Sequence, residues 1–186
     1  MIIAYKGFDK DLSCTSYNNR FQYELDKWNE EPEANCACNG FHCAEDPLDC
    51  LRYYPDWKNS VYYMVLVGGD INEDGADSRI SCTRLKLLKQ LDLEELIAHS
   101  LRYLCVHPFR KKHNYRVKED RGEAYSGFTV IRGKNPIAKG KMGDVLGLLK
   151  EESNSRRIAE AGIYTVDGAT ILPDIWYDIN GNREVA

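Results

Sequence analysis

The residue types best suited to chemistry in this chain gather between positions 36 and 50, which hold four of its seven cysteines and one of its four histidines. Thiolate and imidazole are the donors that tetrahedral zinc prefers. Cys36, Cys38, His42 and Cys43 are therefore the candidate zinc ligands. Their spacing differs from that of a zinc ribbon, where two C-x-x-C pairs stand well apart along the chain. In a strand, His42 and Cys43 point to opposite faces, which disfavours a shared ion.

A cysteine nucleophile is the second chemistry that these residues allow. It would need a base beside Cys43, either His42 or His107, to form the thiolate. The chain contains no Gly-x-Ser-x-Gly sequence, no phosphate-binding glycine loop ending in Lys-Ser or Lys-Thr, and no His-Glu-x-x-His sequence. We therefore favour a structural interpretation, in which most of the thiols are reduced and packed in a core.

Two other groups of residues have the composition of a protein-binding surface. One is a basic stretch and the other a pair of aromatic residues near the end of the chain: Arg110, Lys111, Lys112, Tyr115 and Arg116, then Trp176 and Tyr177. Aromatic residues are common at the energetic centres of interfaces. The alternatives are structural: the basic residues form a solvated loop after a helix, and the aromatic residues close a small β core.

Several elements must position these residues. Apolar runs and alternation predict strands over residues 2–5, 21–25, 40–43, 61–67 and 80–88, with an exposed connection over residues 26–35. Asp46 followed by Pro47 predicts the start of a short helix that ends near Tyr54. Asp92 and Glu95 form a capping box, and apolar residues at helical spacing continue that second helix to His107.

After the basic stretch the pattern changes to short apolar runs separated by glycines. We expect strands and turns there, ending in hairpin-type turns at Asp167-Gly168 and Asn180-Gly181. The predicted fold is α+β. Residues 1–112 form a lobe with a mixed sheet and two helices, and residues 113–186 form a small antiparallel β lobe.

Composition limits the function classes. The formal charge is −4, which argues against binding to nucleic acid through a broad positive field. No run is long and apolar enough to span a membrane, and residues 1–6 lack the pattern of a signal peptide. We expect a cytoplasmic protein with reduced cysteines.

The segments Tyr5-Lys6-Gly7-Phe8, Asn39-Gly40-Phe41-His42, Pro47-Leu48-Asp49 and Tyr53-Tyr54-Pro55 resemble the opening of an uncharacterised family of phage and bacterial proteins. Val166-Asp167-Gly168 and Pro173-Asp174-Ile175-Trp176-Tyr177 are similar to the end of that family. The resemblance covers about two thirds of the chain and implies a phage or prophage origin, without an established activity. Longer members carry glycine- and alanine-rich repeats between these parts, and here only a short glycine-punctuated stretch stands there.

A weaker resemblance is to the ADP-ribosyltransferase-like fold, which places an aromatic, a basic residue and a glycine at the end of a first strand. Tyr5-Lys6-Gly7, Gly40-Phe41-His42 and the apolar run 61–67 follow that order. Lys6 stands where this fold usually has Arg or His. Candidates for the later acidic residue are Asp92, Glu94 and Glu95, whose place at the start of a predicted helix also explains them without catalysis. The resemblance implies an NAD pocket lined by Lys6, His42 and Tyr54.

Three functions therefore remain open. The first is a phage accessory protein that binds a host or defence protein, such as a CRISPR-type effector, without catalysis. The second is an NAD-dependent enzyme of the ADP-ribosyltransferase-like fold. The third is a binding module stabilised by zinc.

Overall fold

The computed structural model describes residues 1–16, 19–73, 75, 77–110 and 114–184. The chain divides into two compact units, Met1–Leu96 and Ile97–Ala186. The division lies earlier in the chain than the predicted boundary after residue 112.

The first unit consists mainly of strands. In chain order its elements are β1 (Ile2–Asp9), β2 (Ser13–Ser16), β3 (Asn19–Gln22), β4 (Asn29–Glu30), β5 (Phe41–Ala44), α1 (Pro47–Tyr53), β6 (Ser60–Glu73) and β7 (Arg79–Leu91). The first strand does not stop at Tyr5 as the glycine suggested, because Lys6 and Gly7 lie in the middle of β1. The predicted strand 21–25 is shifted toward the N-terminus, as β3, and β4 lies within the predicted connection.

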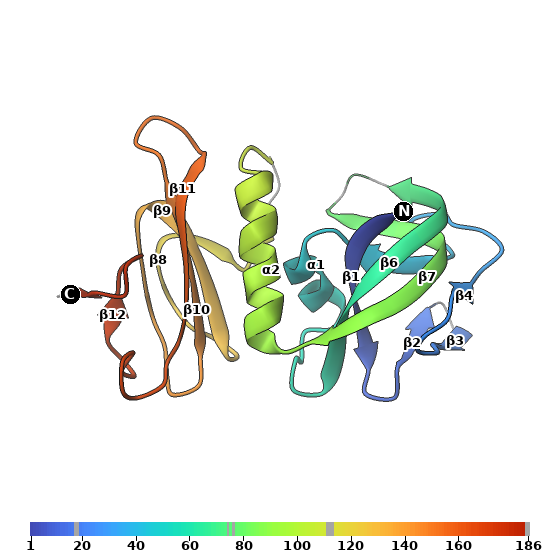
Figure 1. The fold of residues 1–186 in the computed structure, drawn as a ribbon, viewed down its shortest axis with the longest axis horizontal. Coiled ribbons are helices and arrows are strands. Elements are labelled where there is room, and N and C mark those ends of the chain that lie inside the picture. Colours follow the sequence, from blue (N-terminus) through green and yellow to red (C-terminus); the bar gives the residue numbers. More distant parts are fainter. Residues whose placement is uncertain (17–18, 74, 76, 111–113, 185–186) are drawn as a thin grey trace. The chain divides into compact units, whose positions relative to one another are not determined.

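Four of these strands close into a small barrel (Figure 1). β1 pairs with β5 and β6, while β7 pairs with the other edges of β5 and β6. All of these pairs are antiparallel, so the predicted mixed sheet is wrong for this unit. Closure gives both edges of each barrel strand a partner over part of its length, which satisfies backbone groups that an open sheet leaves exposed.

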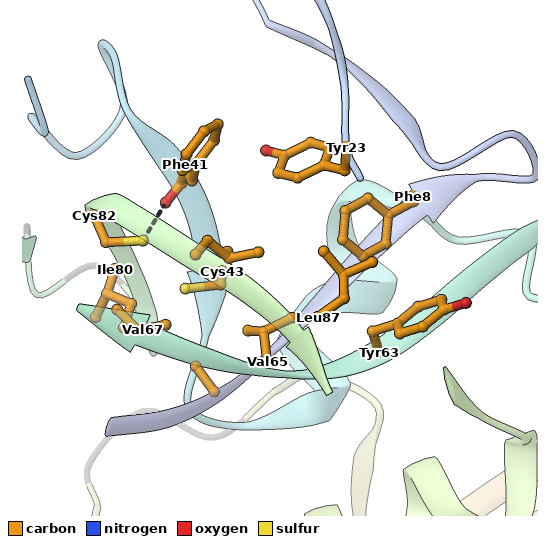
Figure 2. Packing of buried hydrophobic residues seen from close by; sticks show 12 residues of the cluster. Phe8, Tyr23, Phe41, Cys43, Tyr63, Val65, Val67, Ile80, Cys82 and Leu87 are labelled. Atoms are coloured by element: carbon orange, nitrogen blue, oxygen red, sulfur yellow. Dashed lines mark hydrogen bonds between the residues drawn. The ribbon is translucent and has the colours of Figure 1, made fainter. Parts of the chain in front are cut away.

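Apolar side chains from the four strands fill the barrel, and Figure 2 shows their packing. Phe8 of β1 is fully buried, and its ring lies edge-on to Tyr23 and Tyr63, with centroids 4.9 and 5.8 Å away. Such edge-to-face pairs add stability beyond the burial of their area. Cys82 lies in the same cluster, where its thiol donates to the carbonyl of Phe41 at 3.5 Å.

Helix α1 begins where the sequence predicted. The Asp46 carboxylate accepts the N–H of Leu48 at 3.0 Å, and Pro47 occupies the first turn. Asp49 then joins the helix to the segment before β7, since its carboxylate accepts both the N–H and the hydroxyl of Ser78. These bonds hold the first turn of α1 in place.

Helix α2 (Leu93–Val106) starts in the first unit and continues in the second. Its predicted capping box is present: Asp92 accepts the N–H of Glu95 at 2.8 Å, and Glu95 accepts the N–H of Asp92 at 3.2 Å. Among the described residues, no helix is both long enough and apolar enough to cross a membrane.

The second unit contains a six-stranded sheet. Its strands are β8 (Val117–Glu123), β9 (Phe128–Lys139), β10 (Val145–Glu151), β11 (Ile158–Thr165), β12 (Trp176–Tyr177) and β13 (Arg183–Glu184). β9 runs parallel to both β8 and β10, and the remaining pairs are antiparallel. The predicted antiparallel lobe is therefore a mixed sheet. Hairpin-turn dipeptides reveal antiparallel neighbours, whereas parallel pairing leaves no comparable local signal.

Candidate functional site

The first unit contains a cavity of about 330 Å³ beside the barrel. Its wall combines residues from β1, β5, β7 and the end of α1. They include Lys6, Gly7, His42, Tyr53, Tyr54 and Arg79. Small-molecule pockets begin at about this volume.

Beside the cavity, β1 and β5 pair over a short length only. Their ladder consists of one pair, Tyr5 with Ala44. Beyond it Lys6 of β1 and His42 of β5 both line the cavity, and the Lys6 ammonium donates to the carbonyl of His42 at 2.7 Å. A side chain thus bridges the two strands where the backbone ladder has ended.

Lys6 occupies a position that the strand pattern assigns to the core. Side chains alternate along a strand, so Lys6 shares a face with Ala4 and Phe8, both fully buried in the barrel. Lys6 itself is only 5% exposed, and its ammonium lies 5.3 and 5.2 Å from the ring centres of Phe8 and Tyr23. Within the described part of the chain it forms no ion pair with a carboxylate.

The described part of the wall carries a second cation and no acidic residue. Arg79, at the start of β7, lies with its guanidinium 5.5 Å from the ring centre of Tyr53. None of the described residues that line the cavity is Asp or Glu. The formal charge of the wall is therefore positive, although the whole chain is acidic.

His42 is held by the segment that precedes its strand. Its Nε2 accepts the N–H of Ala37 at 3.0 Å, which assigns the ring proton of a neutral imidazole to Nδ1. Ala37 adopts a left-handed conformation with φ of 63°. Gly40 has φ of 79°, and a Cβ there would lie 2.5 Å from the Ser81 hydroxyl, so this turn requires glycine.

Tyr54 lies directly against β1. A Cβ built on Gly7 would come within 2.7 Å of the Tyr54 ring, so the close approach depends on the missing side chain. The carbonyl of Tyr54 accepts the Tyr62 hydroxyl at 2.5 Å, which fixes the chain as α1 ends. Burial raises the pKa of the Tyr54 phenol well above its ordinary value, so the group is a neutral donor.

Asp77 does not line the cavity itself but holds two residues that do, Tyr53 and Arg79. Its carboxylate accepts the N–H of Arg79 at 2.9 Å, the Arg52 guanidinium at 2.9 Å and the Tyr53 hydroxyl at 3.1 Å. Burial alone would raise the pKa of Asp77, but these hydrogen bonds together hold it below the usual aspartate value. Burial, and then the Asp77 charge, raise the pKa of Tyr53 to about 12.

Three thiols also line the cavity: those of Cys14, Cys43 and Cys50. A hydrogen bond with Cys82, and then burial, raise the pKa of Cys43 well above its ordinary value. Burial raises the pKa of Cys50 as well. Both are neutral thiols at physiological pH, which does not favour the nucleophilic role considered for Cys43.

The structure brings together Lys6, His42 and Tyr54, the three residues that the NAD hypothesis named. It does not assemble the candidate zinc ligands Cys36, Cys38, His42 and Cys43. Across the described residues, no group of three or more His, Cys, Asp or Glu side chains is arranged to hold a metal ion. Cys38 is exposed, whereas Cys43 is packed in the barrel.

The residues predicted to bind a partner have different environments. Lys111 and Lys112 lie outside the described residues. Tyr115 is 66% exposed, with the Arg116 guanidinium 5.3 Å from its ring centre. Arg110 is half-buried against Tyr103.

The two aromatic residues near the end of the chain also differ from each other. Trp176 is half-buried, with Arg121 and Lys139 at 4.1 and 5.1 Å from its ring. Tyr177 is 1% exposed in the core of the second unit, and its hydroxyl accepts the N–H of Leu172. Tyr177 therefore matches the structural alternative of a residue that closes a small β core.

Sequence reasoning missed Gly7, Tyr53, Asp77 and Arg79. The signal that the sequence offered is Lys6 itself, a charged residue between the apolar run 2–5 and Phe8, which the structure places within β1. No local pattern marks Arg79, because its place in the wall follows from the pairing of β7 with β5.

A comparison with family models finds one described as a domain of unknown function (DUF7666), which matches residues 2–99, just over half of the chain. The match spans nearly all of the first unit, including its cavity. No curated protein and no solved structure matches the chain.

Proposed function

The chain belongs to the family described as a domain of unknown function (DUF7666), and from that premise we propose that its first unit binds a small anionic ligand of the nucleotide class, NAD among the candidates. The observation that carries this proposal is Lys6, a buried cation without a carboxylate partner among the described residues, in a wall that also holds Arg79. A cavity of this volume accommodates part of a dinucleotide or a mononucleotide.

The energetics of burial support an anion as the ligand. Removing an ammonium from water is costly unless hydrogen bonds and an opposite charge offset the lost hydration. Lys6 has one carbonyl acceptor and two aromatic rings, which offset only part of that cost. A phosphate or carboxylate in the cavity supplies the missing charge and charge-assisted hydrogen bonds.

The rest of the wall supports a ligand that also carries a planar ring. Tyr23, Tyr53 and Tyr54 contribute aromatic surface, and the thiols of Cys43 and Cys50 are neutral and weakly polar. Pockets of this kind bind the apolar part of a ligand and orient it by a few polar groups. A phosphate joined to a nucleobase or nicotinamide ring combines both requirements.

Binding is favoured over catalysis by the state of His42. Its acceptor nitrogen already receives the N–H of Ala37, so it is not available as a general base without the loss of that bond. The described wall offers no carboxylate for the same role. The enzymatic alternative, ADP-ribosyl transfer from NAD with Lys6, His42 and Tyr54 in the pocket, remains a proposal that an experiment can separate from binding.

Thermal unfolding with added ligands tests the proposal. NAD, ADP-ribose and AMP are compared with adenosine and nicotinamide, which lack phosphate. A ligand at one hundred times its Kd stabilises the folded state by about 2.7 kcal/mol, which shifts the Tm by several degrees. We expect such a shift with at least one phosphate-bearing compound, and its loss in Lys6→Met.

Lys10→Met is the matched control, because Lys10 is an exposed lysine of the same unit that does not line the cavity. If no compound shifts the Tm, or if the shift persists in Lys6→Met, the proposal fails. Transfer of label from biotinylated NAD to a protein in host lysate would establish the enzymatic alternative. Binding without transfer would reject it.

A second candidate function is binding to a host or defence protein, such as a CRISPR-type effector, by a cytoplasmic accessory protein of phage or prophage origin. Exposed aromatic residues of the second unit favour it, among them Phe109 and Tyr115. Recovery of a stoichiometric complex that survives Lys6→Ala and His42→Ala but dissociates on Trp176→Ala would support this function. Unchanged recovery with all three variants would exclude both the cavity and Trp176 as the contact.

A further inference from the structure

Independently of the cavity, we infer that the second unit carries a docking surface for an acidic protein segment with an apolar side chain. The surface is formed by Arg102, Val106, Phe109, Arg110, Arg156 and Arg157, and is called the arginine surface below. It joins the last turn of α2 to the connection between β10 and β11.

Two apolar side chains of the arginine surface are exposed. Val106 and Phe109 are three residues apart in the sequence, and they are 66% and 60% exposed. The Arg157 guanidinium lies 5.8 Å from the ring centre of Phe109, so residues distant in sequence meet there. Exposed aromatic and aliphatic side chains beside arginine are typical of the centres of protein interfaces.

The backbone that carries Phe109 is held in place by a buried arginine. Arg132 of β9 donates to the carbonyls of Pro108 and Arg156, each at 2.7 Å, and to the carboxylate of Glu151 at 2.6 Å. These bonds tie the segment after α2 to the connection between β10 and β11. Phe109 is therefore presented on an ordered backbone, which lowers the entropy cost of binding.

The positive charge of the arginine surface favours an acidic partner. It contains four arginines, whereas the chain as a whole has a formal charge of −4. Glu151 pairs with Arg132 and Arg156, and the N–H of Glu152 donates to the carbonyl of Arg157 in the same turn. An excess of positive charge therefore surrounds the exposed Phe109, and an acidic partner complements it.

A protein segment fits this surface better than a nucleic acid. Nucleic-acid binding depends on neutralising many phosphates, which an acidic chain opposes outside a small patch. Val106 is an exposed aliphatic side chain. A nucleic-acid base cannot stack on such a side chain, whereas an apolar side chain of a peptide can pack against it.

Selection from a random library of short peptides tests the inference with the full-length protein. We expect the selected peptides to be rich in Asp and Glu and to contain a large apolar residue. Fluorescence polarisation with a selected peptide should show about tenfold weaker binding for Phe109→Ser and for Arg157→Ser, the loss expected for a central contact. Binding should also weaken as salt is raised.

Tyr125→Ser and Arg183→Ser are the matched controls, since they remove an exposed aromatic residue and an exposed arginine elsewhere in the unit. Their affinity should match that of the parent protein. Selection of neutral or basic peptides, recovery of none, or equal loss in the control variants would overturn the inference. So would displacement of the peptide by single-stranded DNA bound at the same residues, which would identify the surface as a nucleic-acid site.

Discussion

At the scale of residues, the chemistry of the first unit depends on Lys6. A lysine replaces an apolar side chain on the core face of a strand, and its surroundings offer a carbonyl and two rings in place of a carboxylate. Such an arrangement is unfavourable for stability alone. Its presence is explained if the charge serves a ligand, because functional sites often retain groups that weaken the fold.

Replacing Lys6 by Met should leave the free energy of unfolding unchanged or raise it by about 1 kcal/mol, because a buried charge is exchanged for an apolar chain of similar length. Urea denaturation of the ligand-free protein measures this. If the role of Lys6 were purely structural, its removal would instead lower the free energy of unfolding. A loss of more than about 2 kcal/mol in Lys6→Met would therefore contradict our view of this residue.

Asp77 makes the folded state sensitive to acid. Because its pKa is lower in the folded state than in the unfolded state, its contribution is complete above the unfolded value near 3.8 and is lost as the pH falls through the folded value. In Asp77→Asn, the stability should therefore fall less steeply between pH of about 5 and about 2 than in the parent protein. Urea midpoints across that range measure the difference, with Glu73→Gln, an exposed carboxylate of β6, as the control. Identical slopes in all three proteins would show that Asp77 does not contribute.

At the scale of elements, the site results from the incomplete pairing of β1 and β5. One pair joins the strands, and Lys6 of β1 and His42 of β5, just beyond it, line the cavity. The last turn of α1 places Tyr54 over Gly7 at this point. The element geometry thus leaves room for a ligand while the rest of the barrel remains paired.

Gly7→Ala should disturb this arrangement, because the added methyl group would overlap the Tyr54 ring. We expect a loss of about 1 to 3 kcal/mol in stability, typical of overpacking, and weaker binding of any cavity ligand. Gly68→Ala in β6 is a suitable control, since a Cβ there makes only ordinary contacts. Equal stability of the two variants, measured by urea denaturation, would show that Tyr54 moves aside without cost.

At the scale of the whole molecule, the family match and the structure agree on one unit. The matched residues 2–99 contain the complete barrel and the start of α2. The second unit has its own core, which includes Ile131, Leu146, Leu148 and Tyr177. The cavity and the arginine surface therefore lie in different units.

The alkylation rates of the cysteines should differ according to their burial. Cys38 is exposed, whereas Cys43, Cys50 and Cys82 are buried. Iodoacetamide at neutral pH should modify Cys38 first, and should reach the buried three only when the barrel opens, so their rates should rise with denaturant. Peptide mass spectrometry measures each rate. Modification of Cys50 as fast as Cys38 would mean that the cavity admits the reagent freely.

Local sequence signals predicted the helices and the most apolar strand. Asp46-Pro47 starts α1 and the Asp92 and Glu95 pair starts α2, because capping depends on residues within one turn. The run 61–67 became part of β6, although the strand continues to Glu73. The predicted direction of strand pairing was wrong in both units. β-branched and apolar residues favour a strand, but they do not determine which strand it pairs with or in which direction.

The sequence by itself determined the α+β class, the two helix starts and the apolar run that became part of β6. Only the tertiary structure decided that the barrel closes and that residues 6, 42, 54 and 79 surround one cavity. The physical reason is the distance along the chain over which each kind of interaction acts. Caps and alternation involve neighbours in the chain, whereas closure depends on pairings between strands such as β1 and β6, whose stability depends on the packing of the complete core.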